Sequence, residues 1–473
     1  MTNNAPPTRI FKSAIHLLAG RGVTLINQLI YVPLMLSMWG KELYGEWLLL
    51  SAIPSFIELA NGGISKVACV DMIKATARKD SKRFQQIVQT TCTLILLITF
   101  PVAMLLLVAS ATPIDSYLPF SSIDPFEVRV ITFTFVANFI LMQLSQIYDG
   151  MYQSFLSFAR LVVLSNIERL ATAVVVIIFV LRGATPIGVA LTMTIMQFLF
   201  LLARSYDIHN VAEPWARSVM GFGIRHRSHE LVRSLFRPAI SYGLLPLCNA
   251  IRGGGILWII GYALNPAAVA LFSALRTLAN SGGMLLSVVT QSISPELTVA
   301  VTSENHDLAR LIFRKALQVV VVSSIFFAIG LFCAGGWIFA LWTNRELQFD
   351  NQVFTLLLCV VIAKNFWSSA LVVATSSNRH TRDTVFVLLG HLVALSGALV
   401  LVPLIGLPGA AISLLVCDIV ISVFVIRRAL ILLEESSWNF LASFSPSSLI
   451  QLFSFIKQSS TTANHPVPQD HQL

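Results

Sequence analysis

The chain has 473 residues, of which 56% are hydrophobic and only 12% are charged, and its net charge is +9. A soluble domain carries about 25% charged residues, so this composition excludes a soluble globule. The apolar residues form runs of the length that a transmembrane helix needs, and the short alternating segments typical of a membrane β-barrel do not occur. The sequence therefore predicts an all-α integral membrane protein.

Twelve apolar segments follow one another along the chain. We expect transmembrane helices at residues 14–38, 45–70, 86–110, 127–150, 160–181, 186–206, 238–263, 267–294, 313–341, 352–376, 383–404 and 408–430. Lys and Arg gather in every second connection, and the opposite set of connections holds few basic residues, namely Lys41, Arg129, Arg182 and Arg345. This positive-inside pattern places both termini in the cytoplasm, and it accounts for the net charge without a nucleic-acid partner.

The two halves of the chain share short sequence matches. Residues 11–15 (FKSAI) match residues 236–240 (FRPAI), and residues 186–190 (PIGVA) resemble residues 407–411 (LPGAA). Such parallel repeats are common in transporters, whose substrate site lies where the repeats meet. We expect a six-helix lobe over residues 1–205, a basic cytoplasmic linker over 206–237, a second six-helix lobe over 238–430, and an interfacial amphipathic segment with a disordered tail over 431–473.

The opening stretch Phe11–Asp80 resembles the polysaccharide transporter family, through Tyr44-Gly45 at the start of the second span and residues 58–63 (ELANGG) at its far end. This family contains the O-antigen and exopolysaccharide flippases of the multidrug/oligosaccharidyl-lipid/polysaccharide exporter (MOP) superfamily. The resemblance implies two six-helix lobes around a central cavity in a bacterial inner membrane. It also implies a flippase that carries an undecaprenyl-pyrophosphate-linked oligosaccharide to the periplasmic leaflet by ion-coupled alternating access.

The same resemblance also implies which molecules the protein binds or works with. The expected partners are the lipid-linked oligosaccharide, membrane lipids, and a polysaccharide polymerase with its chain-length machinery. No enzymatic activity, cofactor or nucleic acid is expected. The six cysteines occur singly, without the paired spacing of a zinc site, so no metal is expected either.

Ionisable side chains inside a membrane cost roughly 2.5–3.5 kcal/mol each on insertion scales, so they mark functional positions. The predicted substrate-binding residues are Arg21, Arg252, Arg276 and Lys364, with Asn249 and Asn280 on the same polar helix faces. No acidic residue lies within one helical turn of any of these cations, which suits a wet cavity for an anionic cargo. Three consecutive glycines after Arg252 are expected to weaken the seventh span. A polar face that only packs against a neighbouring helix remains the alternative.

The predicted spans contain fewer acidic than basic side chains. Glu58 and Asp418 are the predicted ion-coupling residues, because a carboxylate that loses and regains a proton can bias two conformations. For Glu58, a simple hydrogen bond to a neighbouring helix is the alternative interpretation. The adjacent Glu168 and Arg169 are expected either to form a local ion pair or to extend their charges toward the membrane surface.

Two other functions fit parts of the pattern. A multidrug exporter of the same superfamily, working as a cation antiporter, would share the fold, although a cavity rich in Arg and Lys repels cationic drugs. A polysaccharide polymerase or ligase would present a large outer loop, whereas the longest expected outer loop runs only from Ser110 to Asp124.

The topology can be tested by cysteine labelling. Cysteines introduced at Ser121 and Ser228 should react with an impermeant thiol reagent from opposite faces of the membrane, because the predicted spans place the two positions on opposite sides. Labelling of both positions from outside would contradict the twelve-span topology.

Overall fold

The computed structural model describes residues 6–55, 63–111, 120–217, 220–221, 231–232, 235, 243–244, 246–303, 305–377 and 381–445. The first half contains α1 (Pro6–Ser51), α3 (Ile64–Ala77), α4 (Ser81–Ala111), α5 (Pro125–Ser154), α6 (Phe158–Leu181), α7 (Pro186–Val211) and the short α8 (Pro214–Arg217). The second half contains a π-helical turn (Ile251–Gly255), α10 (Ile256–Ala263), α11 (Pro266–Thr302), α12 (His306–Trp342), α13 (Asn351–Ser376), α14 (Thr381–Ile405), α15 (Leu407–Leu432) and α16 (Ser437–Ala442).

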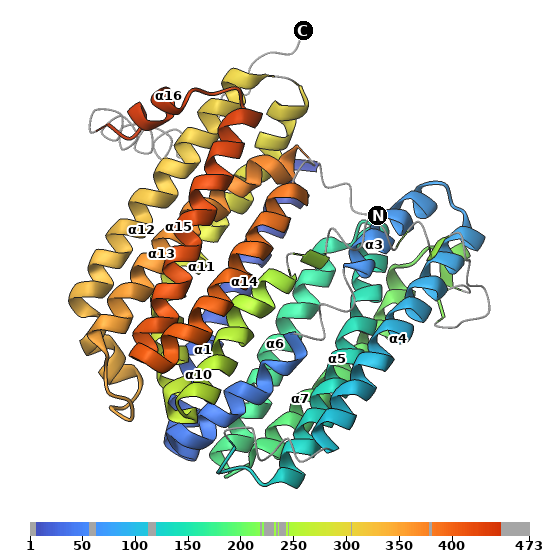
Figure 1. The fold of residues 1–473 in the computed structure, drawn as a ribbon. Helices are drawn as coiled ribbons and strands as arrows, with labels where there is room; N and C mark the ends of the chain where they lie inside the picture. The colour runs from blue at the N-terminus through green and yellow to red at the C-terminus, as the bar shows by residue number, and fades with distance from the viewer. Residues whose placement is uncertain are drawn as a thin grey trace.

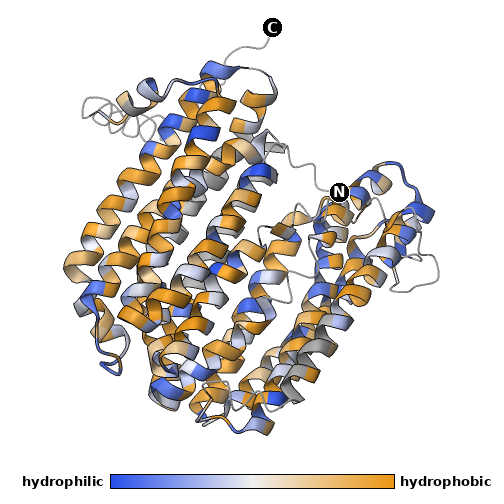
Figure 2. Cartoon of the chain, in the orientation of Figure 1, coloured by the Kyte–Doolittle hydropathy of each residue, from blue (hydrophilic) through white to orange (hydrophobic). Residues whose placement is uncertain are grey.

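The helical membrane class predicted from the sequence is confirmed. Eight helices of the described residues are long and apolar enough to cross a membrane, and each predicted span coincides with helical backbone over most of its length. Hydrophilic residues are concentrated near the two ends of the helices, and apolar residues follow their lengths (Figure 2). This arrangement suits a bilayer, in which every backbone group must be satisfied within the helix.

The helices gather in two bundles that form a V (Figure 1). One bundle contains α3–α7 and the other contains α11–α15. The bundles approach each other near α10 and diverge toward the end at which α12 begins and α15 ends. The positive-inside rule predicts that this wide end faces the cytoplasm.

Helix α1 links the two bundles. It bends at Gly40, which has φ 75°. Before the bend, the Leu29 carbonyl accepts a hydrogen bond from Trp342 Nε1 of α12 at 2.7 Å. At the bend, Trp39 Nε1 donates to the carbonyl of Ala184, in the α6–α7 connection, at 2.9 Å. A single helix therefore makes polar contacts to both bundles.

A buried carboxylate secures the outer end of the first bundle. Glu46 is fully buried, and its two oxygens accept hydrogen bonds from the backbone N–H groups of Ser121, Ser122 and Ile123 at 2.7–2.8 Å. These residues lead into α5, whose first turn is capped by Asp124. Charge-assisted bonds to several amides stabilise an otherwise costly buried charge. Glu46 therefore joins the start of the second span to the start of the fourth.

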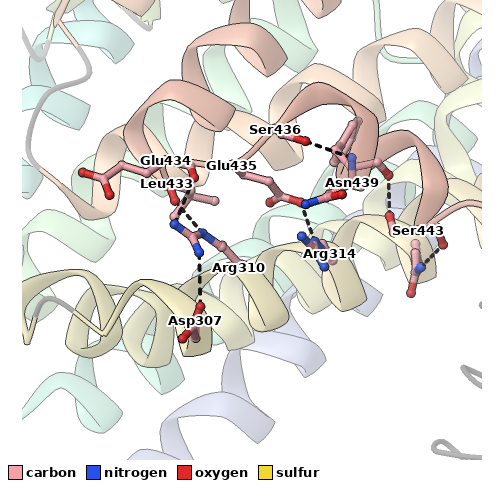
Figure 3. Close-up of polar contacts among 11 residues, drawn as sticks. Asp307, Arg310, Arg314, Leu433, Glu434, Glu435, Ser436, Asn439 and Ser443 are labelled. Carbon is pink, nitrogen blue, oxygen red and sulfur yellow. Dashed lines mark hydrogen bonds and ion pairs between the residues drawn. The ribbon is translucent and has the colours of Figure 1, made fainter.

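The segment after α15 lies against the beginning of α12 (Figure 3). Arg310 donates to the carbonyls of Leu433 and Glu434 at 2.8 and 2.9 Å, and Arg314 forms an ion pair with the buried Glu435. Phe440 of α16 is also buried. The described part of the predicted interfacial segment is thus a six-residue helix held on α12; the rest, from residue 446, lies outside the described residues.

The narrow end of the V depends on a glycine. A Cβ added to Gly45 of α1 would lie 1.9 Å from the carbonyl oxygen of Pro266, at the start of α11. We expect Gly45→Ala to lower the melting temperature of the purified protein, because overpacking of this kind costs about 1–3 kcal/mol. Gly188→Ala in α7 is the control, since its Cβ would meet its nearest neighbour, the Ala184 Cβ, at an ordinary 3.5 Å. Equal melting temperatures for the two variants would contradict this close approach.

Candidate functional site

A cavity of about 550 Å³ lies in the second bundle. Its walls come from the π-helical turn, α11, α13 and α15, and Gln28 of α1 contributes from the first half. The lining contains the predicted residues Asn249, Arg252, Arg276, Asn280 and Lys364. The structure thus brings together the predicted substrate-binding residues with the exception of Arg21, whose side chain lies outside the described part of the chain.

The π-helical turn positions the seventh span beside the cavity. The glycines predicted to weaken this helix fall in the turn Ile251–Gly255, so the expected irregularity is confirmed. Gly255 also permits close packing, because an added Cβ would lie 2.8 Å from Leu395 Cδ1 of α14. A Cβ on Gly253 would meet no atom within 4 Å. Such π-helical turns occur frequently at functional sites.

Arg252 is paired with an acidic residue of another helix, although no acidic residue lies within one helical turn of it. Its two terminal nitrogens donate to the two oxygens of Asp418 on α15, at 2.6 and 2.7 Å. Asp418 is fully buried and also accepts a hydrogen bond from Trp367 Nε1 at 3.0 Å. A bidentate pair of this geometry offsets the desolvation of both groups. The partner was missed because it approaches from a helix that is distant in the sequence.

The surroundings of Asp418 could supply three metal-ligating atoms. Atoms of His391, Cys417 and Asp418 lie within 4.8 Å of one another. However, His391 Nε2 is also 3.4 Å from a terminal nitrogen of Arg252, and the guanidinium already uses both Asp418 oxygens. A second cation beside this guanidinium would be repelled. The geometry therefore favours an ion pair at this position over a metal site.

The ion-coupling hypothesis stays a prediction. Glu58 lies outside the described residues. Asp418 does not line the cavity directly, but it contacts the lining residue Arg252.

Arg276 and Lys364 provide the positive charge of the cavity. Arg276 donates to the Gly253 carbonyl at 3.2 Å, and its guanidinium carbon lies 5.8 Å from the centre of the Phe272 ring. Within the described part of the chain, no carboxylate forms a salt bridge with Arg276 or Lys364. Neither contact of Arg276 neutralises its charge, so the cavity can bind an anionic group.

The first bundle has its own buried charges. Glu168 of α6 was expected to pair with its neighbour Arg169, but its carboxylate accepts a hydrogen bond from Arg204 of α7 at 2.6 Å. Arg204 also lies 3.4 Å from Asp149 of α5. The local pairing is therefore replaced by a cluster that connects three helices.

Sequence reasoning missed His391 and Trp367, which surround the buried ion pair. A single histidine within the apolar span 383–404 was the available signal for His391. Trp367 carried no such signal, because an indole in an apolar span usually only packs.

The fold is similar to that of several solved transporters. An inward-facing multidrug resistance MATE family transporter of the MOP superfamily superposes with a TM-score of 0.71 at 12% identity, over 91% of this chain and 100% of that one. The outward-facing conformation of such a transporter gives 0.64 at 13% identity, over 91% of this chain and 97% of that one. The chain therefore shares the two-lobed fold of these proteins, and the higher score belongs to the inward-facing form.

A third similar structure is a MOP superfamily transporter from Pyrococcus furiosus, with a TM-score of 0.65 at 13% identity. The similarity covers 91% of this chain and 96% of that one. At the level of sequence, no protein-family model and no curated protein matches the chain.

The Arg252–Asp418 pair can be tested by removing the charge of one partner and then replacing both partners. We expect Asp418→Asn to lower the amount of protein in the membrane, because breaking a buried ion pair costs about 3–5 kcal/mol. Replacing both partners, by Arg252→Met with Asp418→Leu, should restore much of that amount, since neither charge is then left alone. Quantitative immunoblots of membranes provide the measurement. A double variant less abundant than Asp418→Asn would contradict this pairing.

Proposed function

We propose that the chain is a secondary transporter of the multidrug-exporter type, which moves small amphiphilic molecules with an anionic group across the membrane by alternating access. The observation that carries this proposal is the cavity in which Arg276 and Lys364 have no carboxylate partner among the described residues. The MATE multidrug resistance transporters among the similar structures favour an exporter over the flippase expected from the sequence.

The chemistry of the cavity supports an organic anion. The planar guanidinium of Arg276 can hold two oxygens of a carboxylate, sulfonate or phosphate, and Lys364 adds a point charge. Apolar wall residues, Leu357, Val360 and Val361, can contact the rest of the molecule. The volume of about 550 Å³ falls within the range of about 300–1,000 Å³ that is typical of pockets for drug-sized ligands.

The sign of the cavity charge argues against cationic cargo. A cation entering the cavity would meet Arg276 and Lys364, and like charges in a partly dehydrated site are costly. The Pyrococcus furiosus transporter is described as having a binding pocket of reverse polarity that suggests a different function for it. A positively charged cavity on the same fold is therefore compatible with a cargo other than a cation.

The lipid-linked oligosaccharide flippase is the second candidate, because the pyrophosphate of such a cargo would suit the same two cations. The flippase predicts a different phenotype. Deletion of the gene would remove surface glycan, whereas deletion of an exporter would leave the glycan intact and raise sensitivity to exported compounds.

The cargo can be tested in proteoliposomes. We expect uptake of an anionic fluorescent organic molecule and no uptake of a cationic analogue of similar size. Arg276→Ala and Lys364→Ala should each lower the affinity for the anion tenfold or more, because a hydrogen bond to a charged group contributes about 1.5–3 kcal/mol. The readout is the concentration of cargo that gives half-maximal uptake.

Arg182→Ala is the matched control, since Arg182 is exposed at the end of α6 and does not line the cavity. It should transport as the wild type does. Preferential uptake of the cation would overturn the proposed cargo class. Failure to transport either molecule, together with loss of surface glycan in the deletion strain, would favour the flippase.

A further inference from the structure

A second cavity, of about 540 Å³, lies on the outer side of the α14–α15 pair. Its apolar part includes Ile419, Val420 and Val423 of α15 together with the rings of Phe386 and Phe424. The two rings stack with their centroids 3.6 Å apart. None of the residues that line this cavity lines the cargo cavity. The outer groove is therefore a separate feature of the second bundle.

One end of the groove is strongly basic. Arg382 in the first turn of α14 and Arg427 and Arg428 near the end of α15 line it. Arg428 lies 3.5 Å from the buried carboxylate of Asp383, which offsets one of the three positive charges. Arg382 and Arg427 are exposed, and the described residues provide neither with a salt-bridge partner. The groove thus keeps two accessible cations at one end.

The spacing along α15 matches one leaflet of a bilayer. Eight residues separate Arg427 from Ile419, which corresponds to about 12 Å of helix. One leaflet contributes about half of the roughly 30 Å hydrocarbon core. Ile419 and Val423 expose 50% and 56% of their surfaces. The arginines can therefore lie at the head-group level while the apolar part of the groove lies beside the acyl chains.

We propose that this groove binds an anionic glycerophospholipid of the cytoplasmic leaflet. The phosphate accepts charge-assisted hydrogen bonds from Arg382 and Arg427, and the acyl chains lie over Phe386, Phe424 and Val423. Basic pockets between transmembrane helices on the cytoplasmic side are suited to anionic head groups. An apolar helix of a partner protein would leave the two arginines without a counter-charge, so the lipid suits the whole groove better.

The test compares two lipids that differ only in head group. Native mass spectrometry of the detergent-purified full chain should show binding of dioleoyl phosphatidylglycerol at least tenfold tighter than binding of dioleoyl phosphatidylcholine. The double variant Arg382→Ala with Arg427→Ala should bind phosphatidylglycerol no better than phosphatidylcholine. Arg427→Lys should keep most of the preference, because an ammonium group also attracts phosphate.

The control removes two exposed positive charges from another cytoplasmic connection, by Arg78→Ala with Lys82→Ala. It should retain the wild-type preference, and an equal loss in this control would show a general charge effect and overturn the site. Equal binding of both lipids by the wild type would also overturn it.

If the double variant aggregates, the thermal stability of the wild type with each lipid tests the proposal instead. Phosphatidylglycerol should raise the melting temperature more than phosphatidylcholine, and high salt should remove the difference by screening. A preference that persists in high salt would contradict the proposal.

Discussion

An ionised side chain inside a membrane must face an opposite charge or water, and this requirement shapes both bundles. In the first bundle, Arg204 lies against Glu168 and Asp149 from two other helices. In the second, Arg252 holds Asp418 across a separation of 166 residues. Each pairing joins helices that apolar packing alone would leave free to slide, because lipid tails are as apolar as the helix surfaces. The buried charges therefore fix which helix faces meet.

The need of a buried charge for a counter-charge or water distinguishes two kinds of cation in the second bundle, those paired within the protein and those that border the cavity. Arg252 reaches a carboxylate that its geometry satisfies, so its charge is used within the protein. Arg276 and Lys364 border the same cavity, and neither forms a salt bridge with a described carboxylate. Their charge is therefore directed at whatever fills the cavity. In the proposed transporter, a positive potential of this kind would select cargo by sign, whereas apolar walls of the cavity would accept varied shapes.

The sequence predicted the class of fold and the composition of the cavity, since span lengths, the basic connections and polar residues at helical spacing are local properties. It predicted that glycines 253–255 disturb their helix for the same reason. The sequence did not predict which residues form the buried ion pairs. Periodicity shows which residues share a helix face, but the partner of Arg252 lies on α15 and that of Glu168 on α7. Glu46 also escaped notice, because its partners are backbone amides that carry no sequence signature.

If the chain is the transporter proposed above, the position of the cavity constrains its cycle. Apart from Gln28, its described lining belongs to the second half of the chain, so cargo can travel with one bundle without being shared between two. Opening the outer end requires Gly45 to separate from Pro266, a contact of a glycine with backbone. Gln28 and Leu29 are adjacent on α1, and the Leu29 carbonyl is bonded to Trp342 of α12. Helix α1 is therefore the element through which occupancy of the cavity can change the angle between the bundles.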